Sequence, residues 1–277
     1  MANFFSNITS GISKRLSAQI NSPYKKAGLN WFKIKYLKHL PYHKPGTFNL
    51  KGTKVHFING PEVLHSLVEI FVEDIYNIEF KTPKPYILDC GANMGLATIY
   101  LKKRYPEAVI LAFEPDENNF SLLQKNINQH QWKNIELRKE AVWKDDCTLK
   151  FKCDGTLGSK ISDNNESGTE IEVKAIRLKH LLNQPVDFLK MDIEGAEYEV
   201  IKDCAENLHN IKNLFIEFHG HFNKMHELNT IFDIVTKAGF SYYIKEAAPV
   251  YHTPFNRNPT PMSYDLQLNI FCFRINE

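Results

Sequence analysis

Short apolar segments alternate with helix-length segments over the last two thirds of this 277-residue chain, and this alternation constrains the fold more than any other feature. Parallel strands need a long crossover between them, usually a helix, so the pattern indicates α/β architecture. We expect a doubly wound, mostly parallel seven-stranded sheet. Its strands are predicted at residues 86–90, 108–113, 135–142, 186–191, 213–218, 240–244 and 266–274, and its helices between about 95 and 105 and at residues 118–130, 196–208 and 225–238.

The first part of the chain lacks this alternation and is expected to form a separate extension of helices and a hairpin. A Pro-containing segment, residues 81–85, indicates a boundary, which divides the chain into residues 1–82 and a domain of residues 83–277. The extension is predicted to contain helices at residues 8–20, 29–40 and 61–76 and a hairpin at residues 48–57.

The first of these helices is amphipathic. Its apolar positions recur every four residues, at Ile8, Ile12, Leu16 and Ile20. Such a stripe either docks on its own domain or on a partner subunit, which would make the protein a homo-oligomer, or lies on a membrane surface. The basic pair Lys14 and Arg15 lies off the stripe, as the membrane alternative requires.

Composition excludes several classes of protein. The chain is 43% hydrophobic with a formal net charge of only +2, so it has material for a core and no overall excess of positive charge that would indicate a nucleic-acid partner. It has no apolar run of spanning length and no secretory signal at its start. Its five cysteines lack paired spacing, which favours reduced thiols. We expect a soluble, cytoplasmic protein.

The first motif with chemical content follows the strand predicted at residues 86–90. Gly91, Asn93 and Gly95 form a turn that opens a helix, where glycines let a ligand approach the backbone and free N–H groups point outward. Asp89 precedes the turn. A carboxylate there suits the cationic amino-acid end of a ligand better than a pyrophosphate, which it would repel.

A second acid lies at the end of the next predicted strand. Glu114 follows Gly95 by 19 residues, which is the distance at which a carboxylate holds the ribose hydroxyls of a nucleotide. The turn lacks the GxGxxG spacing of dinucleotide-binding proteins. The two motifs together therefore favour S-adenosylmethionine as the cofactor over NAD.

Polar residues also end the predicted strands at residues 186–191 and 213–218. Asp192 follows the first, and Glu217 and His219 share one face of the second. If these strands are neighbours, the three side chains can hold a divalent cation such as Mg²⁺, provide a general base, or form a polar network that only positions the strand ends.

Five blocks of sequence together resemble the FkbM family of class I S-adenosylmethionine-dependent methyltransferases, whose fold is Rossmann-like. The blocks are residues 87–95, 113–115, 141–143, 189–197 and 216–219, and they occur in the family's order and spacing. The resemblance implies O-methylation of a sugar, glycan or natural product. Two alternatives from other classes stay open, a non-catalytic nucleotide-binding scaffold subunit and an NAD-dependent oxidoreductase.

The resemblance also implies roles for individual residues. Gly91, Asn93 and Gly95 would surround the methionine part of the cofactor, with Asp89 near its ammonium group. Glu114 would hold the ribose, and Glu140 and Ala141 would face the adenine. The remaining roles are expected from the residues themselves, not from the resemblance. Asp192, beside the cofactor loop, is expected to contact the acceptor hydroxyl, His219 is the better-matched general base because its ordinary pKa is about 6.5, and Glu217 would orient it or join a metal site. The Pro-rich segment 249–262 is expected to be a lid over the acceptor.

Overall fold

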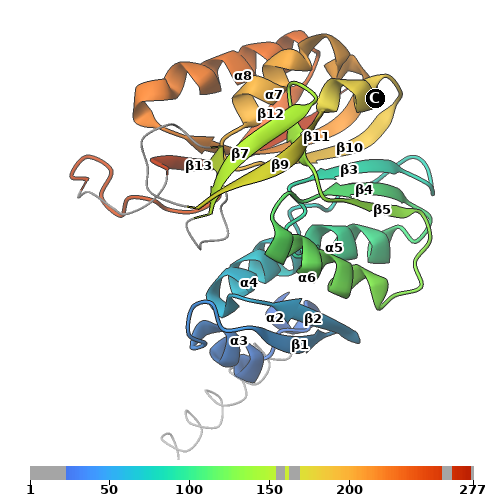
Figure 1. Ribbon diagram of the computed structural model, residues 1–277, viewed down its shortest axis with the longest axis vertical. Helices are drawn as coiled ribbons and strands as arrows, with labels where there is room; N and C mark the ends of the chain where they lie inside the picture. The colour runs from blue at the N-terminus through green and yellow to red at the C-terminus, as the bar shows by residue number, and fades with distance from the viewer. Residues whose placement is uncertain (1–22, 154–159, 162–168, 258–263, 276–277) are drawn as a thin grey trace, which may run out of the picture. The chain divides into compact units, whose positions relative to one another are not determined.

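The computed structural model describes residues 23–153, 160–161, 169–257 and 264–275 (Figure 1). The chain divides into two compact units, residues 1–79 and residues 80–277. The amphipathic helix predicted at residues 8–20 lies outside the described residues. No helix in the described part of the chain is both long enough and apolar enough to cross a membrane.

The first unit contains three α-helices and a two-stranded antiparallel sheet among its described residues. In chain order they are α2 (Pro23–Lys26), α3 (Trp31–Lys38), β1 (Gly46–Leu50), β2 (Thr53–Phe57) and α4 (Gly60–Leu67), which continues into a π-helical segment (Val68–Val72). The hairpin turn needs two left-handed residues, and Lys51 and Gly52 supply them with φ of 47° and 84°. The predicted hairpin is confirmed.

The second unit contains the predicted seven-stranded sheet. The strand order is β12-β13-β11-β10-β3-β4-β5, and only β13 runs against its neighbours. The strands are β3 (Tyr86–Cys90), β4 (Val109–Phe113), β5 (Ile135–Arg138), β10 (Val186–Met191), β11 (Ile211–Gly220), β12 (Ser241–Glu246) and β13 (Leu266–Phe273). The doubly wound, mostly parallel fold expected from the alternation is confirmed.

Helices cover both faces of this sheet. Figure 1 shows α5 (Leu96–Arg104) and α6 (Glu117–Asn128) on one face and α7 (Glu197–Asp203) and α8 (Met225–Lys237) on the other. Strand β10 lies in the middle of the sheet and is buried along its whole length, its charged residues Asp187 and Lys190 included. The carboxyl ends of β3, β4, β10 and β11 therefore meet above a packed core.

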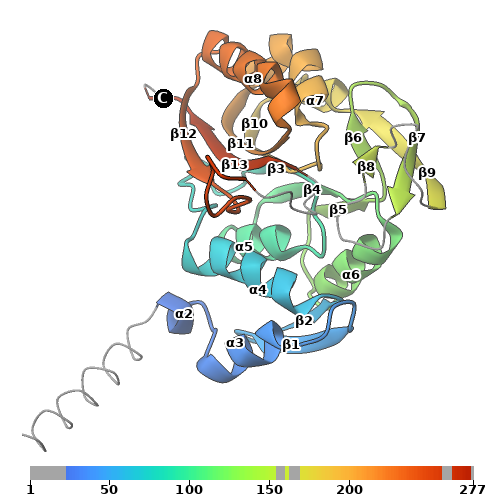
Figure 2. The same cartoon turned by 90° about the vertical axis from the view of Figure 1, so that its left-hand side faces the viewer.

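A second sheet, not predicted from the sequence, follows β5. It has the strand order β6-β9-β7-β8, with β6 (Ala141–Trp143), β7 (Cys147–Cys153), β8 (Lys160–Ile161) and β9 (Thr169–Arg177). Figure 2 shows these strands beside α7. The strand predicted at residues 135–142 is thus two strands that belong to different sheets. The period-2 alternation of β7 and β9 was the signal that could have revealed them.

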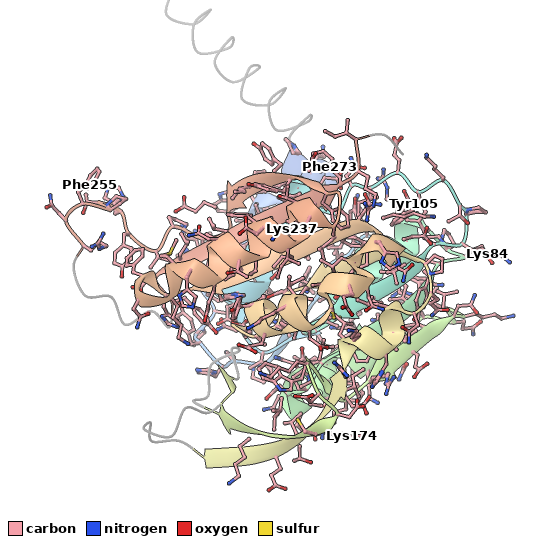
Figure 3. The ribbon with its side chains drawn as sticks, turned by 90° about the horizontal axis from the view of Figure 1, so that it is seen from above. Lys84, Tyr105, Lys174, Lys237, Phe255 and Phe273 are labelled. Carbon is pink, nitrogen blue, oxygen red and sulfur yellow. The ribbon has the colours of Figure 1, made fainter. Side chains whose placement is uncertain are left out.

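The Pro-rich segment after β12 is described only in part, because residues 258–263 lie outside the described range. Tyr251 Oη donates to Asp265 Oδ1 at 2.7 Å, and Phe222 stacks on the Tyr251 ring with centroids 5.8 Å apart. Phe255 is fully exposed and lies at the outer end of the loop in Figure 3. The lid role of this segment stays a prediction.

Candidate active site

A pocket lies at the carboxyl ends of β3, β4 and β10, with ≈ 640 Å³ of empty space when the adjoining open solvent is included. It is lined by Gly91, Asn93, Phe113, Glu114, Pro115, Asp116, Asn119, Glu140, Ala141, Val142, Leu149, Asp192, Ile193, Glu194 and Ala196. This edge is where open α/β sheets bind ligands. We call residues 91–93, Glu114 and residues 140–141 its β3–β4 side. The β10–β11 side consists of residues 190–197, Glu217 and His219.

The β3–β4 side begins with a turn that passes very close to the loop after β10. A Cβ built on Gly91, whose φ is 81°, would lie 1.7 Å from the backbone oxygen of Asp192, so only glycine fits. Asp192 N also donates to Cys90 O at 3.1 Å. The two loops are therefore joined through their backbones, and the sequence-predicted residues Gly91 and Asp192 lie together in the pocket wall.

Glu114 is the buried acid of the β3–β4 side. Its two carboxylate oxygens accept hydrogen bonds from Asn93 N at 2.8 Å and Asp116 N at 2.9 Å. Burial raises the pKa of Glu114 to about 8, although these backbone donors oppose the rise. Glu114 is 5% exposed and lines the pocket, as the ribose role requires.

The far end of this side is mostly apolar. Ala141, Val142 and Leu149 line the pocket there, and Leu149 comes from the second sheet. Glu140 also lines it, but both of its carboxylate oxygens are engaged. Arg138 Nη2 lies 2.6 Å from Oε2, and Lys174 Nζ lies 2.7 Å from Oε1.

Two predicted residues of the glycine turn lie outside the pocket lining. Asp89 is fully buried and accepts a hydrogen bond from Thr98 Oγ1 at 2.6 Å. Gly95 caps α5 and packs against α6, where an added Cβ would lie 2.6 Å from Leu123 Cδ1. Both residues therefore contact the protein interior rather than the pocket. The contact predicted between Asp89 and a ligand ammonium stays a prediction.

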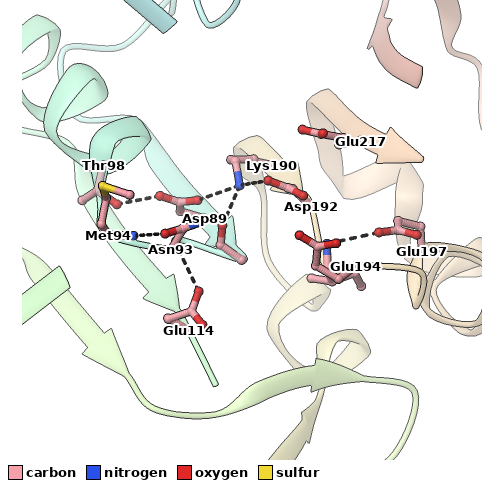
Figure 4. A network of polar contacts seen from close by, with 12 residues as sticks. Asp89, Asn93, Met94, Thr98, Glu114, Lys190, Asp192, Glu194, Glu197 and Glu217 are labelled. Atoms are coloured by element: carbon pink, nitrogen blue, oxygen red, sulfur yellow. Dashed lines mark hydrogen bonds and ion pairs between the residues drawn. The ribbon is translucent and has the colours of Figure 1, made fainter. Parts of the chain in front are cut away.

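Lys190 connects the two sides of the pocket, a role that no motif in the sequence indicated. Its ammonium donates to Gly91 O at 2.7 Å and to Asp192 Oδ2 at 3.1 Å, and lies 3.5 Å from Asp89 Oδ1. Figure 4 shows it between the two carboxylates. Lys190 is 4% exposed, and its register partner on β3 is Asp89. A buried lysine of this kind needs a carboxylate partner, and the register provides one.

His219 lies at the centre of the β10–β11 side, behind the pocket lining. Its Nδ1 is 3.1 Å from Glu197 Oε1, and its Nε2 is 3.7 Å from Glu194 Oε2 and 3.8 Å from Glu217 Oε1. Burial alone would lower the pKa of His219. The Glu197 carboxylate, assisted by Glu194 and Asp192, instead raises that pKa to about 10. The imidazole is thus a charged donor at neutral pH.

Tyr264, for which the sequence indicated no role, contacts both Glu194 and His219 on this side. Its hydroxyl donates to Glu194 O at 2.8 Å, and its ring centroid lies 4.8 Å from that of His219. Burial raises the pKa of Tyr264 above its ordinary value, so it stays a hydrogen-bond donor. Tyr264 therefore holds the loop after β10 against β11.

Among the described residues, the group of donor atoms that could hold a cation differs from the predicted set. One ligand atom each from Asp192, Glu194 and His219 lie within 4.8 Å of one another. Glu194 thus takes the place predicted for Glu217. The pairing of Glu197 with Nδ1 would orient Nε2 toward a cation, as carboxylates do for many histidine ligands. The carboxylates of Glu194 and Glu217 near Nε2 would stabilise a positive charge there, and either a proton or a cation can supply it.

The sequence is similar to those of known methyltransferases. The profile of the family described as "Methyltransferase FkbM domain" matches residues 89–242. "Methyltransferase 1" of Beauveria bassiana (strain ARSEF 2860) is 29% identical over 182 residues, which cover 56% of this chain and 72% of that protein. "Methyltransferase sdnD" of Sordaria araneosa is 27% identical over 186 residues, covering 54% and 72%.

Among solved structures, "Methyltransferase FkbM" from Methylobacillus flagellatus KT aligns with a TM-score of 0.44 at 16% identity. The alignment covers 70% of this chain and 45% of that one.

Proposed function

The chain belongs to the FkbM methyltransferase family, and from this premise we propose that it transfers the methyl group of S-adenosylmethionine to a hydroxyl group of a sugar, glycan or natural product. The observation that carries the proposal is one pocket lined by both Glu114 and Asp192. One side of this pocket offers what a nucleoside needs, and the other offers a carboxylate to an incoming hydroxyl.

The β3–β4 side fits the nucleoside part of the cofactor. Each oxygen of Glu114 accepts one backbone N–H and keeps a lone pair, so the carboxylate can accept from both ribose hydroxyls. Asn119 Oδ1 is buried and has no hydrogen-bond partner among the described residues, and Asn119 lines the pocket. It is a second acceptor for a ligand donor. The apolar surface of Ala141, Val142 and Leu149 suits a flat base.

S-adenosylmethionine, when bound, supplies a methyl group already activated on a sulfonium sulfur. The task left to the protein is to hold the acceptor oxygen in line with that methyl group and to remove the hydroxyl proton. The backbone junction between Gly91 and Asp192 keeps the two sides of the pocket at a fixed separation. We infer that this junction sets the alignment.

Asp192 is the residue best placed to accept the hydroxyl proton. It lines the pocket, its side chain is 24% exposed, and Lys190 holds one of its oxygens. His219 does not line the pocket, its side chain is 2% exposed, and Glu197 engages its Nδ1. We therefore assign proton acceptance to Asp192 in place of His219, and we assign to His219 the positioning of Glu194.

Calorimetry tests the cofactor assignment. S-adenosylmethionine and its demethylated product should bind with dissociation constants in the micromolar range, equivalent to about −8 kcal/mol. Glu114→Ala should weaken binding by about 1.5–3 kcal/mol, the scale of hydrogen bonds to a charged group. Glu136→Ala, a change at a side chain that is 63% exposed, is the matched control. Absence of binding, or equal binding of NAD, would reject the assignment.

Transfer of a radiolabelled methyl group tests the acceptor class. Panels of hydroxyl-bearing sugars and glycans should yield methyl ethers that resist mild base, whereas methyl esters would not. Label found only on nitrogen, on sulfur or in base-labile esters would reject the O-methylation of hydroxyls and leave the cofactor assignment intact.

A further inference from the structure

Charge is distributed very unevenly along this chain. The first 61 residues contain ten Lys and Arg residues and no Asp or Glu. The rest of the chain contains 24 basic and 32 acidic residues, so it carries a formal net charge of −8. A strongly basic segment within a nearly neutral protein is typical of a surface that meets an anionic partner.

Helix α3 presents an outward aromatic face in this basic segment. Trp31, Phe32 and Tyr36 are 56%, 75% and 47% exposed, whereas Leu37 is fully buried. On the opposite side of the helix, Lys33 Nζ donates to Gly28 O at 2.9 Å and to Asn49 O at 2.6 Å. These inward contacts hold one side of α3 against its own unit. The aromatic side chains lie on the other side and therefore face outward.

Lysines share the outward face with the aromatic rings. Lys35 and Lys38 lie one and two turns after Trp31 and are exposed. Lys35 Nζ lies 4.9 Å from the centroid of the Trp31 ring, and the Trp31 and Phe32 rings meet edge to face at 5.0 Å. The rings and the lysine of this face are therefore in contact with one another. The outer face of α3 is defined here as Trp31, Phe32, Lys35, Tyr36 and Lys38.

We propose that the outer face of α3 docks on the surface of an anionic phospholipid bilayer. Interfacial helices combine bulky aromatic side chains, which enter the boundary between headgroups and acyl chains, with lysines that remain at the phosphates. Tryptophan and tyrosine favour that boundary because one part of each ring is apolar and another is polar. Phe32, with no polar atom in its side chain, gains only from an apolar environment.

The same features favour a bilayer over nucleic acid. Between residues 23 and 61 the chain has lysines and no arginine. Lysine is a strongly hydrated point charge, whereas protein surfaces that bind nucleic acid favour the flat, bidentate guanidinium of arginine. The proposal does not depend on the function proposed above.

Flotation of the full chain with lipid vesicles tests the proposal. The protein should float with vesicles of phosphatidylcholine mixed with phosphatidylglycerol, much less with phosphatidylcholine alone, and less again as salt is raised. The double variant Trp31→Ala, Phe32→Ala should lower the partition coefficient at least tenfold, since about 0.8 kcal/mol is gained per buried CH₂. Lys35→Gln should lower it about fivefold, the factor for one lysine near such a surface.

Matched controls come from the second unit. Tyr243→Ala removes an aromatic side chain that is 61% exposed, and Lys237→Gln removes an exposed lysine. Both should float like the unchanged protein, and all variants should keep its circular dichroism and its affinity for S-adenosylmethionine.

Three results would overturn the proposal. They are no flotation with anionic vesicles, equal flotation with both vesicle types, or unchanged flotation of the α3 variants. Binding to single-stranded RNA that the α3 variants lose, with no vesicle binding, would assign the face to nucleic acid instead. Cofactor calorimetry is a separate readout, so failure here and failure of the proposed methyl transfer are distinguishable.

Discussion

The two sides of the pocket are built on different principles. On the β3–β4 side, Glu114 is held by backbone N–H groups that the turn after β3 and the start of α6 present, and among the described residues the side-chain ion pairs of this side are confined to Glu140 at its far end. On the β10–β11 side, charged side chains hold one another, and Lys190 and His219 each lie among several carboxylates.

This difference separates the demands of binding from those of chemistry. Backbone donors stay in place when a ligand enters or leaves, which suits a side that binds a constant cofactor. A network of side-chain charges can share a proton among its members, which suits a side that must accept one. Lys190 belongs to both, because it holds the carbonyl of Gly91 and the carboxylate of Asp192.

Asp192→Asn is expected to give the largest effect and would sharpen the comparison most. Turnover should fall by a factor of about 10²–10⁴, the scale of general-base catalysis, because the amide cannot take the proton. Cofactor affinity should stay within about threefold if binding belongs to the other side. Initial rates at saturating cofactor, together with calorimetry, measure both quantities. Asp233→Asn on α8 is the exposed control, and a loss below tenfold would place the proton acceptor elsewhere.

Lys190→Met tests whether the two sides are joined. The change leaves the fully buried Asp89 without its cation, and removing one partner of a buried pair typically costs about 3–5 kcal/mol. Urea unfolding should show a loss on this scale, and cofactor binding should weaken as well, because the carbonyl of Gly91 loses its donor. Lys202→Met, an exposed change on α7, serves as reference. A loss of less than about 1 kcal/mol would mean that each side stands alone.

The pH dependence of cofactor binding tests the β3–β4 side by itself. Glu114 has a pKa raised to about 8, so it is mostly protonated at pH 7 and ionised at pH 9 in the free protein. The ionised carboxylate accepts both ribose hydroxyls, so affinity should rise about tenfold as pH increases over that range.

The stability of the free protein should change in the opposite direction. Between the unfolded pKa of about 4.5 and the folded value, the unfolded chain releases a proton that the folded chain keeps, so the contribution of Glu114 falls as pH rises. Glu114→Gln should remove both trends. If calorimetry shows the same pH dependence in this variant, another group is responsible.

Chelation is expected to produce the smallest change in turnover. A large change would contradict the contrast drawn between the two sides of the pocket. If His219 carries the positive charge that the β10–β11 side needs, excess EDTA should alter turnover by less than about twofold. Activity that disappears with EDTA and returns with magnesium would instead make Asp192, Glu194 and His219 a cation site. The carboxylates of that side would then serve as ligands rather than as proton acceptors.

The regular part of the fold was readable from the sequence. All seven strands of the main sheet were expected close to where they lie, because apolar runs, Pro and Gly act on residues near them in the chain. The strand expected at residues 135–142 was wrong in one respect. That segment contains all of β5 and the first two residues of β6, and the division between two sheets depends on what each half pairs with.

The positions of the site residues were also predictable from motifs that are local in the chain. Gly91, Asn93, Glu114, Glu140, Ala141 and Asp192 line the pocket, as the motifs indicated for residues at strand ends. The number and spacing of the cysteines did not show which thiols are buried. Cys90, Cys204 and Cys272 are buried, whereas Cys147 is exposed.

The sequence by itself determined the strand-end positions and the family, because turn chemistry and hydrophobic period are properties of short stretches. Only the tertiary structure decided which charges meet. Lys190 lies opposite Asp89 because β10 pairs with β3 in a register that aligns those two residues. The pKa of His219 is raised because the turn after β10 and the start of α7 bring Glu194 and Glu197 to β11. These pairings depend on strand order and on burial, and charge interactions become strong only where the folded chain excludes water.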